Sequence, residues 1–137
     1  MTELCYTTSL AGVRAEQLEG FFEGWPKPPT PETHLRLLAQ SDLIVLAIDA
    51  KADRVVGFIT ALTDGVLAAY IPLLEVLPAY RGKGIGSELV RRVLEVLGEL
   101  YAIDLLCDAE LQPFYEALGM QRATGMMVRH YAGQAGR

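Results

Sequence analysis

Residues 70–90 read Tyr-Ile-Pro-Leu-Leu-Glu-Val-Leu-Pro-Ala-Tyr-Arg-Gly-Lys-Gly-Ile-Gly-Ser-Glu-Leu-Val. An apolar run typical of a strand ends at Pro78, the glycine-rich stretch 81–86 follows, and an amphipathic helix begins directly after it. Glycines allow positive φ and a close approach of a ligand to the backbone. A helix start offers N–H groups without intrahelical partners and the positive end of the dipole. The stretch therefore predicts an anion-binding loop, most naturally for phosphate or pyrophosphate.

Two common phosphate motifs do not fit this loop. A P-loop ends in Gly-Lys-Ser/Thr and a dinucleotide fingerprint reads Gly-x-Gly-x-x-Gly, whereas residues 82–87 have neither that ending nor a sixth-position glycine. The pattern that does fit is Arg/Gln-x-x-Gly-x-Gly, carried by Arg81, Gly84 and Gly86. The plainer alternative is a glycine-rich turn between a strand and a helix.

A second stretch, residues 101–120, agrees with the first. A short apolar strand at 103–107 precedes a short helix with the sequence Phe114-Tyr115-Glu116-x-Leu118-Gly119-Met120. The first motif resembles the coenzyme A pyrophosphate loop of the GCN5-related N-acetyltransferases (GNAT), and the second resembles the Phe-Tyr-x-x-Leu-Gly-Phe signature near the end of the same family. The two motifs stand in the family's order and spacing, and the resemblance covers nearly the whole chain.

The resemblance implies an α+β fold and a single N-acetyltransferase domain over residues 1–137. The expected sheet is mixed, mostly antiparallel and twisted, with about six to seven strands and about four flanking helices. In this fold the fourth strand carries a bulge and splays away from the fifth, and the acyl-pantetheine arm lies in the gap. Pro72 is consistent with irregular pairing, because proline removes a ladder donor.

Hydrophobic periodicity and turn residues predict the individual elements. Thr30 and Pro31 form a helix start, with threonine as N-cap and proline at the first position. The expected helices cover residues 15–24, 31–40 and 85–100, besides the short helix near 114. The expected strands cover residues 4–9, 43–48, 54–62, 66–77, 103–107 and 126–131, with a further short strand near 121–123.

The resemblance also implies acetyl-CoA as cosubstrate and assigns residues to its binding. Backbone amides of residues 82–87 should supply most of the binding, with Arg81 and Lys83 beside the pyrophosphate. Asp108 stands where the family often has asparagine, and the chain contains no asparagine. The predicted coenzyme contacts are Leu74, Val76, Arg81, Gly82, Lys83, Gly84, Ile85, Gly86, Ser87, Asp108 and Tyr115.

Acyl transfer to an amine needs a general acid for the leaving thiolate and a route for the amine proton. Tyr115 matches the tyrosine that commonly protonates the coenzyme A sulfur in this family. Its alternative is a core aromatic beside Phe114. The base stays open. Glu75 is the nearest strand carboxylate, points to the face opposite Leu74 and Val76, and is predicted to act as the base or to orient a water; Asp108 and Glu110 are the other acids near the expected groove. A water chain, or an amine already neutral in solution, would need no dedicated base.

The acceptor side is predicted from family position. Tyr70 occupies the fourth-strand position where relatives carry Glu or His, and Trp25 stands in the loop expected near the acceptor pocket. Both are assigned to substrate binding, and Trp25 could equally be a packing residue. His34 and His130 are isolated, so surface or structural roles are expected for them.

Composition bounds the remaining classes of function. The 137 residues suit one domain with a proper core, and the formal charge of −5 argues weakly against nucleic acid as a partner. No apolar run is long enough to cross a membrane, and no secretion signal is recognised. Cys5 and Cys107 have no metal-ligand spacing. A cytoplasmic protein without membrane or metal partner is expected.

The sequence therefore predicts an acetyl-CoA-dependent N-acetyltransferase that acts by direct transfer in a ternary complex. The acceptor is a primary amine on a small molecule or a peptide. The alternative is a non-catalytic coenzyme A-binding sensor or interaction module of the same fold. Transfer of a longer acyl group, with room beside Ala68 and Ala69, is a third hypothesis. The resemblance also suggests a homodimer formed through the terminal strand Met126–Tyr131.

Overall fold

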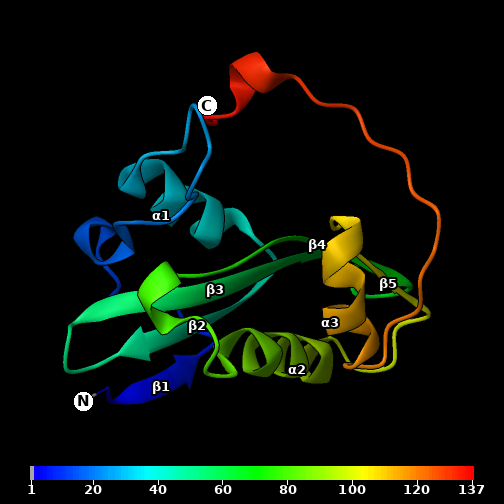
Figure 1. The fold of residues 1–137 in the computed structure, drawn as a ribbon, viewed down its shortest axis with the longest axis horizontal. Coiled ribbons are helices and arrows are strands. Elements are labelled where there is room, and N and C mark those ends of the chain that lie inside the picture. Colours follow the sequence, from blue (N-terminus) through cyan, green and yellow to red (C-terminus); the bar gives the residue numbers. More distant parts are fainter. Residues whose placement is uncertain (1) are drawn as a thin grey trace.

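The structure is a computed structural model that describes residues 2–137. Its single sheet has the order β1-β2-β3-β4-β5, antiparallel from β1 to β4 and parallel between β4 and β5. Helices α1 and α2 lie on opposite sides of this sheet, and α3 lies near β5 (Figure 1). The strands are β1 (Leu4–Thr7), β2 (Leu43–Asp49), β3 (Arg54–Thr63), β4 (Ala68–Val76) and β5 (Ala102–Asp104), and the helices are α1 (Pro31–Gln40), α2 (Ile85–Leu97) and α3 (Gln112–Glu116).

Strand β3 forms the centre of the core because helices cover both of its faces. Gly57 points toward α2: a Cβ there would stand 3.1 Å from Leu89 Cδ1 and 3.2 Å from Ile85 Cγ2, so a side chain would push the helix away. The adjacent Phe58 points to the other face, where its ring lies 4.4 Å from that of His34 on α1. Burial on both faces explains why β3 reads as a continuous apolar run instead of an alternating one.

The expected irregularity of β4 is present. Thr60 of β3 pairs with Leu73, and Leu62 pairs with Tyr70, so two steps along β3 match three along β4 and a bulge results. Pairing with β5 covers only residues 68–70 of β4. Beyond Tyr70 the pairing stops because β5 ends at Asp104, and Pro72 stands where its missing N–H removes no bond to β5. The expected bulge in the fourth strand is thus confirmed.

The expected numbers of strands and helices are wrong. The part of the chain that the structure describes contains five strands and three α-helices. The expected helix at 15–24 is only a 3₁₀ turn, Ala15–Leu18, because Gly20 and Phe22 take positive φ (95° and 63°) and end it. The expected strand Met126–Tyr131 is absent, as is the short strand near 121–123. Residues 121–130 are exposed and carry no regular structure.

His34 lies in an aromatic cluster with Phe21, Phe22 and Phe58. The side chain is only 1% exposed, and neither ring nitrogen has a hydrogen-bond partner. Burial lowers its pKa to about 4, so the ring is neutral at pH 7. The structural role expected for His34 agrees with this environment.

We expect His34 to make the stability of the fold depend on pH. The pKa is about 4 in the folded chain and about 6.5 when exposed, so as pH falls the unfolded chain binds the proton first. The contribution of His34 to the free energy of unfolding is therefore complete above about pH 6.5, and the free energy of unfolding falls by about 3 kcal/mol toward pH 4. Urea unfolding of His34→Leu and the parent at several pH values measures the difference. His130→Gln is the control, and equal pH slopes in His34→Leu and the parent would contradict the assignment.

Candidate active site

The glycine-rich loop leads directly into the N-terminus of α2. Gly82 and Gly84 have φ of +76° and +82°, and a Cβ at either position would meet nothing within 4 Å. Gly84 is the N-cap of α2, so the first amides of the thirteen-residue helix point into the loop without intrahelical partners. Ile85 is buried and anchors this end of the helix in the core. The loop is therefore open and offers N–H donors without intrahelical partners, and the buried Ile85 holds it against the core. These are the properties that a phosphate-binding loop needs.

Tyr80 fixes the start of this loop to the β2–β3 hairpin. Its hydroxyl donates to Asp49 Oδ2 at 2.8 Å, and the buried Asp49 carboxylate also accepts from the backbone N–H of Lys51. This hydrogen bond from Tyr80 is the first cause that lowers the pKa of Asp49. The sequence had not indicated this contact, since the two residues are 31 positions apart. Lys83 lies over the Tyr80 ring, with Nζ 5.5 Å from the centroid.

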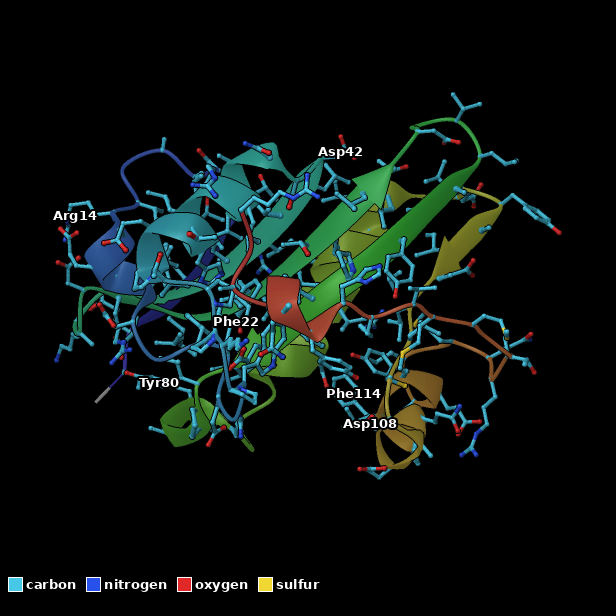
Figure 2. All side chains as sticks on the ribbon, turned by 90° about the horizontal axis from the view of Figure 1, so that it is seen from above. Arg14, Phe22, Asp42, Tyr80, Asp108 and Phe114 are labelled. Carbon is cyan, nitrogen blue, oxygen red and sulfur yellow. The ribbon has the colours of Figure 1, made fainter. Side chains whose placement is uncertain are left out.

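The second motif lies against the first. Phe114 on α3 approaches the start of α2: a Cβ on Gly86 would stand 3.5 Å from Phe114 Cζ and 3.8 Å from Val76 Cγ2. The two sequence motifs, nearly 30 residues apart, thus form one site together with the end of β4. Figure 2 labels Phe114 and Asp108 beside α3 at this side of the molecule. A larger side chain at position 86 would separate α3 from α2.

Tyr115 lies next to Phe114, and their rings meet edge to face at 4.9 Å. It is half-buried. Burial, with a smaller effect of Cys107, raises the pKa of Tyr115 to about 12. The hydroxyl therefore carries its proton throughout the physiological range, which suits a proton donor and excludes a phenolate base at neutral pH.

The gap between β4 and β5 begins at Tyr70, which pairs with Asp104 in the last rung of the parallel ladder. Beyond it, Leu74 and Val76 are half-buried and face the α2 side, since Val76 approaches Gly86. Their backbone groups on the β5 side have no strand partner in the register of the sheet. The unpaired side of β4 thus runs from Tyr70 toward the glycine-rich loop, and it can offer strand amides to an extended ligand.

Glu75 faces the opposite side of the sheet, as its alternation with Leu74 and Val76 predicts. Its Oε1 accepts from the Phe22 N–H at 2.8 Å, and its Oε2 accepts from the Glu23 N–H at 3.3 Å. Phe22 has φ of +63°, a conformation that costs about 1–3 kcal/mol and persists only when its surroundings hold it. Glu75 is therefore placed to hold the turn at residues 20–25, a contact that the sequence did not indicate.

The same turn reaches the glycine-rich loop through Arg81. One guanidinium nitrogen lies 2.9 Å from Glu23 Oε2, and Nε donates to the Val76 carbonyl at 2.9 Å. The backbone N–H of Trp25 closes the turn by donating to the Phe22 carbonyl, and the Trp25 ring packs on the Phe22 ring with their centroids 4.9 Å apart. Trp25 is 37% exposed. One ion pair thus joins the expected acceptor loop to the expected coenzyme loop.

Asp108 lies between β5 and α3, exposed, at the start of the 3₁₀ turn Ala109–Leu111. Its carbonyl accepts from the Leu111 N–H at 2.9 Å, and its side chain makes no capping bond. The carboxylate is thus available at the α3 side of the gap. The structure brings most of the predicted coenzyme residues together around one end of α2, while Glu75 points away from them.

We expect substitution of Glu75 by Gln to disturb acceptor binding more than the chemical step. The amide keeps one acceptor oxygen, so one of the two turn contacts is lost at a cost of about 1–3 kcal/mol. The predicted result is a raised KM for the amine with kcat within about threefold of the parent. A fall in kcat of about 100-fold at saturating amine would instead identify Glu75 as the base.

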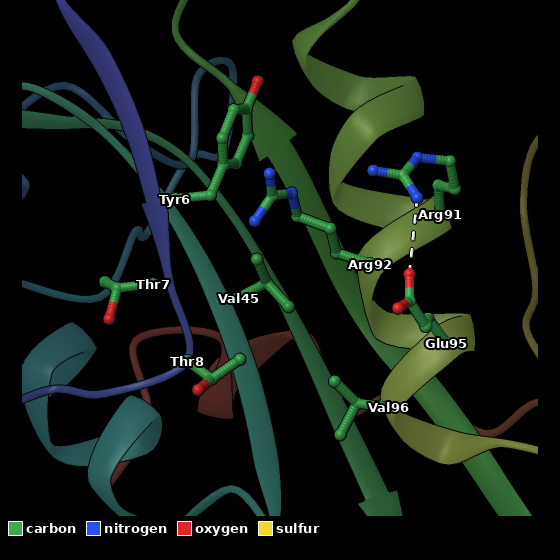
Figure 3. Close-up of a pocket in the computed structure, with 8 residues that line it drawn as sticks. All are labelled: Tyr6, Thr7, Thr8, Val45, Arg91, Arg92, Glu95 and Val96. Atoms are coloured by element: carbon green, nitrogen blue, oxygen red, sulfur yellow. Dashed lines mark hydrogen bonds and ion pairs between the residues drawn. The ribbon is translucent and has the colours of Figure 1, made fainter.

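Two hollows lie outside the β4–β5 gap. One, about 730 Å³, lies between β1 and α2 and is lined by residues that include Tyr6, Arg92 and Val96 (Figure 3). Arg92 stacks over Tyr6 at 4.4 Å and pairs with Glu88 at 2.6 Å, so its charge is already matched. The other, about 250 Å³, lies behind Phe22 and His34.

The part of the chain that the structure describes, residues 2–137, offers neither a metal centre nor a membrane-spanning helix. Within that range the structure shows no cluster of three or more His, Cys, Asp or Glu side chains able to hold a metal ion. The helices described there are all too short or too polar to cross a membrane.

Comparison with known proteins decides the family. The model of the acetyltransferase (GNAT) family matches residues 10–120. The chain belongs to this family. A crystal structure of a "putative acetyltransferase" from Deinococcus radiodurans R1 is 52% identical to this chain, and the match covers 100% of this chain and 99% of that one, with a TM-score of 0.95. The GNAT fold of the present chain is thereby shown over its length.

Two further relatives are more distant. An uncharacterized N-acetyltransferase, ycf52 of Pyropia yezoensis, is 27% identical over 119 residues, which are 83% of this chain and 68% of that protein. The aminoglycoside N-acetyltransferase AAC(6')-Iy, whose structure contains CoA, is 16% identical and covers 95% of both chains with a TM-score of 0.68. At that identity the likeness concerns the fold alone.

Proposed function

We propose that this GNAT protein transfers an acetyl group from acetyl-CoA to a primary amine, directly, within a ternary complex. The observation that carries the proposal is the meeting of the two motifs: an open glycine-rich loop at the start of α2, with Tyr115 held beside it by the contact of Phe114 with Gly86. A phosphate cradle, unpaired strand amides and a proton donor within one site are the parts that thioester aminolysis requires.

The cosubstrate fits the residues present. The cradle at Gly82 and Gly84 has room where a Cβ would otherwise stand, and the amides that follow it favour a pyrophosphate. The unpaired side of β4 offers backbone amides near Leu74 and Val76 for an extended amide-bearing arm. When bound, acetyl-CoA supplies a thioester, whose carbonyl carbon accepts the amine and whose sulfur leaves.

The chain's own residues then have three tasks. Strand amides of β4 orient the arm, which supports alignment worth up to about 7–11 kcal/mol. Tyr115 donates its phenolic proton to the departing sulfur, and the proton that the amine loses as the amide forms returns to the phenolate, directly or through water. The donor step is matched to a group that stays protonated at neutral pH. The turn at 20–25, with Trp25 exposed on it, and Tyr70 at the head of the gap line the acceptor side.

One observation favours the alternative of a non-catalytic coenzyme A binder. Both oxygens of Glu75 already accept hydrogen bonds from the turn, so the nearest strand carboxylate is engaged. A protein with the cradle and the proton donor but without a base could still transfer to an amine that is neutral in solution. Turnover therefore has to be measured against amines with low as well as high pKa.

Calorimetric titration with acetyl-CoA tests the first half of the proposal, with ATP and NAD as controls. Selective binding of acetyl-CoA is the expected result, and its absence in folded protein would overturn the assignment of the loop. An amine screen that follows the release of free thiol tests the second half. Binding without turnover of any amine, and without slow acetyl-CoA hydrolysis, would favour the binding module over the enzyme.

A further inference from the structure

The hollow of about 250 Å³ behind Phe22 and His34, here called the α1 hollow, has a buried floor and an exposed rim. Phe21, Phe22 and His34 contribute to the floor, and Glu19, Gly20 and Pro28 contribute to the rim. Within the part of the chain that the structure describes, the lining contains none of the predicted coenzyme or acceptor residues. The α1 hollow is therefore separate from the candidate active site and open to a ligand from solvent.

His34 is the polar group of this floor. The residue is 1% exposed, and among residues 2–137 neither Nδ1 nor Nε2 of its ring finds a hydrogen-bond partner. A buried polar atom without a partner costs about 1–3 kcal/mol, and native structures satisfy most such atoms. Because His34 lines the α1 hollow, a ligand bound there can supply the missing partner.

The walls of the α1 hollow favour a flat apolar body. Two phenyl rings and three proline rings contribute to the lining, namely those of Phe21, Phe22, Pro28, Pro29 and Pro31. An apolar cavity of about 150 Å³ admits benzene, whereas pockets for drug-sized ligands begin at about 300 Å³. At about 250 Å³ the α1 hollow suits a ligand with a single ring.

The polar chemistry of the lining favours a neutral hydroxyl. Burial lowers the pKa of His34 to about 4, so at neutral pH its ring offers one N–H donor and one acceptor nitrogen. A hydroxyl both donates and accepts, so it can pair with either nitrogen. Among the described residues that line the hollow, Glu19 has the only charged side chain, and it would repel an anion.

We propose that the α1 hollow is a second binding site, which takes a single-ring phenol with its hydroxyl on His34. The ring of the ligand lies between the phenyl and proline walls, and the hydroxyl pairs with an imidazole nitrogen. A bound ring also supports the turn at residues 20–25, because Phe22 forms part of the wall and its N–H donates to Glu75 at 2.8 Å. The inference needs neither coenzyme nor acceptor residues, so it stands or falls independently of acetyl transfer.

The test is a titration of the full-length protein at neutral pH with para-cresol and with toluene, which differ only by the hydroxyl, followed by NMR of the imidazole nitrogens. The ring-nitrogen signals of His34 should shift saturably with para-cresol. Those of His130, the other histidine of the chain and an exposed one, should not move. The affinity for para-cresol should exceed that for toluene by about tenfold, because toluene leaves the imidazole nitrogen unpaired.

His34→Phe is the matched variant, because it keeps an aromatic ring in the floor and removes both nitrogens. It should bind para-cresol and toluene with equal affinity, whereas the control His130→Gln should keep the tenfold preference. If His34→Phe does not fold, the signals of His34 in the parent decide the question. N-acetyltyrosinamide separates the two sources of a phenol: its binding points to a tyrosine side chain of a peptide, and binding of para-cresol alone points to a free small molecule.

Three results would overturn the proposal. One is the absence of a saturable shift at His34, and another is equal affinity of the parent for para-cresol and toluene. The third is tighter binding of benzoate than of para-cresol. That result would assign the α1 hollow to an anion drawn by Arg54, whose guanidinium donates to the carbonyl of Glu19 at 2.6 Å.

Discussion

Replacing Tyr115 by Phe should lower kcat for acetyl transfer by about 100-fold or more, because general acid catalysis contributes about 10²–10⁴ to such reactions. The phenol is half-buried, its pKa is raised to about 12, and it stands beside the loop that would hold the coenzyme. The ring that packs edge to face on Phe114 is retained in the variant. Stopped assays of thiol release at saturating acetyl-CoA measure kcat, and calorimetry measures the affinity for acetyl-CoA.

The control for this experiment is Tyr101→Phe, which removes a phenol hydroxyl from an 87% exposed side chain outside the candidate site. It should leave kcat unchanged. An unaltered kcat in Tyr115→Phe would show that the sulfur leaves without a proton from this residue. A selective loss of acetyl-CoA affinity, with kcat retained, would reassign Tyr115 from proton donor to binding residue.

Replacing Gly84 by Val should weaken acetyl-CoA binding by about 100-fold. The N-cap of α2 has φ of +82°, and its open surroundings are the space that a pyrophosphate would fill. A β-branched side chain there both disfavours the backbone conformation and occupies the cradle. Calorimetric titration of the folded variant with acetyl-CoA measures the loss, and urea unfolding measures the accompanying cost in stability.

Gly98→Val is the matched control, because Gly98 caps the other end of the same helix with φ of +69° and nothing within 4 Å of a Cβ. Both variants should lose stability, by about 1–2 kcal/mol or more. Only Gly84→Val should lose the coenzyme. Equal affinities in the two variants would mean that the glycine-rich loop does not receive the pyrophosphate.

Local signals were sufficient for much of the fold. The Thr30 cap accepts from the Thr33 N–H as its position predicts, the β2–β3 hairpin forms, and α2 buries one apolar stripe. These elements depend on contacts between near neighbours or on a strong 3.6-residue period. The helix expected at 15–24 fails because the turn that follows Leu18 is held by Glu75, more than 50 residues away. A window along the sequence contains no such information.

The candidate site likewise contains residues that local sequence motifs predicted and contacts that they could not predict. Residues 81–87 and Tyr115 come from contiguous motifs, and the structure brings them together through Phe114 and Gly86. The links of Glu75 with the turn, of Arg81 with Glu23 and of Tyr80 with Asp49 join distant segments, so no spacing pattern announces them. The prediction of a strand at Met126–Tyr131 was wrong because the β-rich composition of this segment says nothing about which sheet edge it would join.

The ion pair of Arg81 with Glu23 links the glycine-rich loop to the turn at residues 20–25 through one guanidinium group. A pyrophosphate that binds Arg81 would compete with the Glu23 carboxylate for the same guanidinium. Binding of the coenzyme and the ion pair with the turn therefore oppose each other. By thermodynamic linkage, an amine whose binding releases Glu23 from Arg81 raises the affinity for coenzyme by the same factor as coenzyme raises the affinity for that amine. Both partners are about half exposed, which limits the exchange to about 1 kcal/mol, or about fivefold in either affinity. One coupling free energy then sets both the effect of the amine on coenzyme affinity and the effect of the coenzyme on amine affinity.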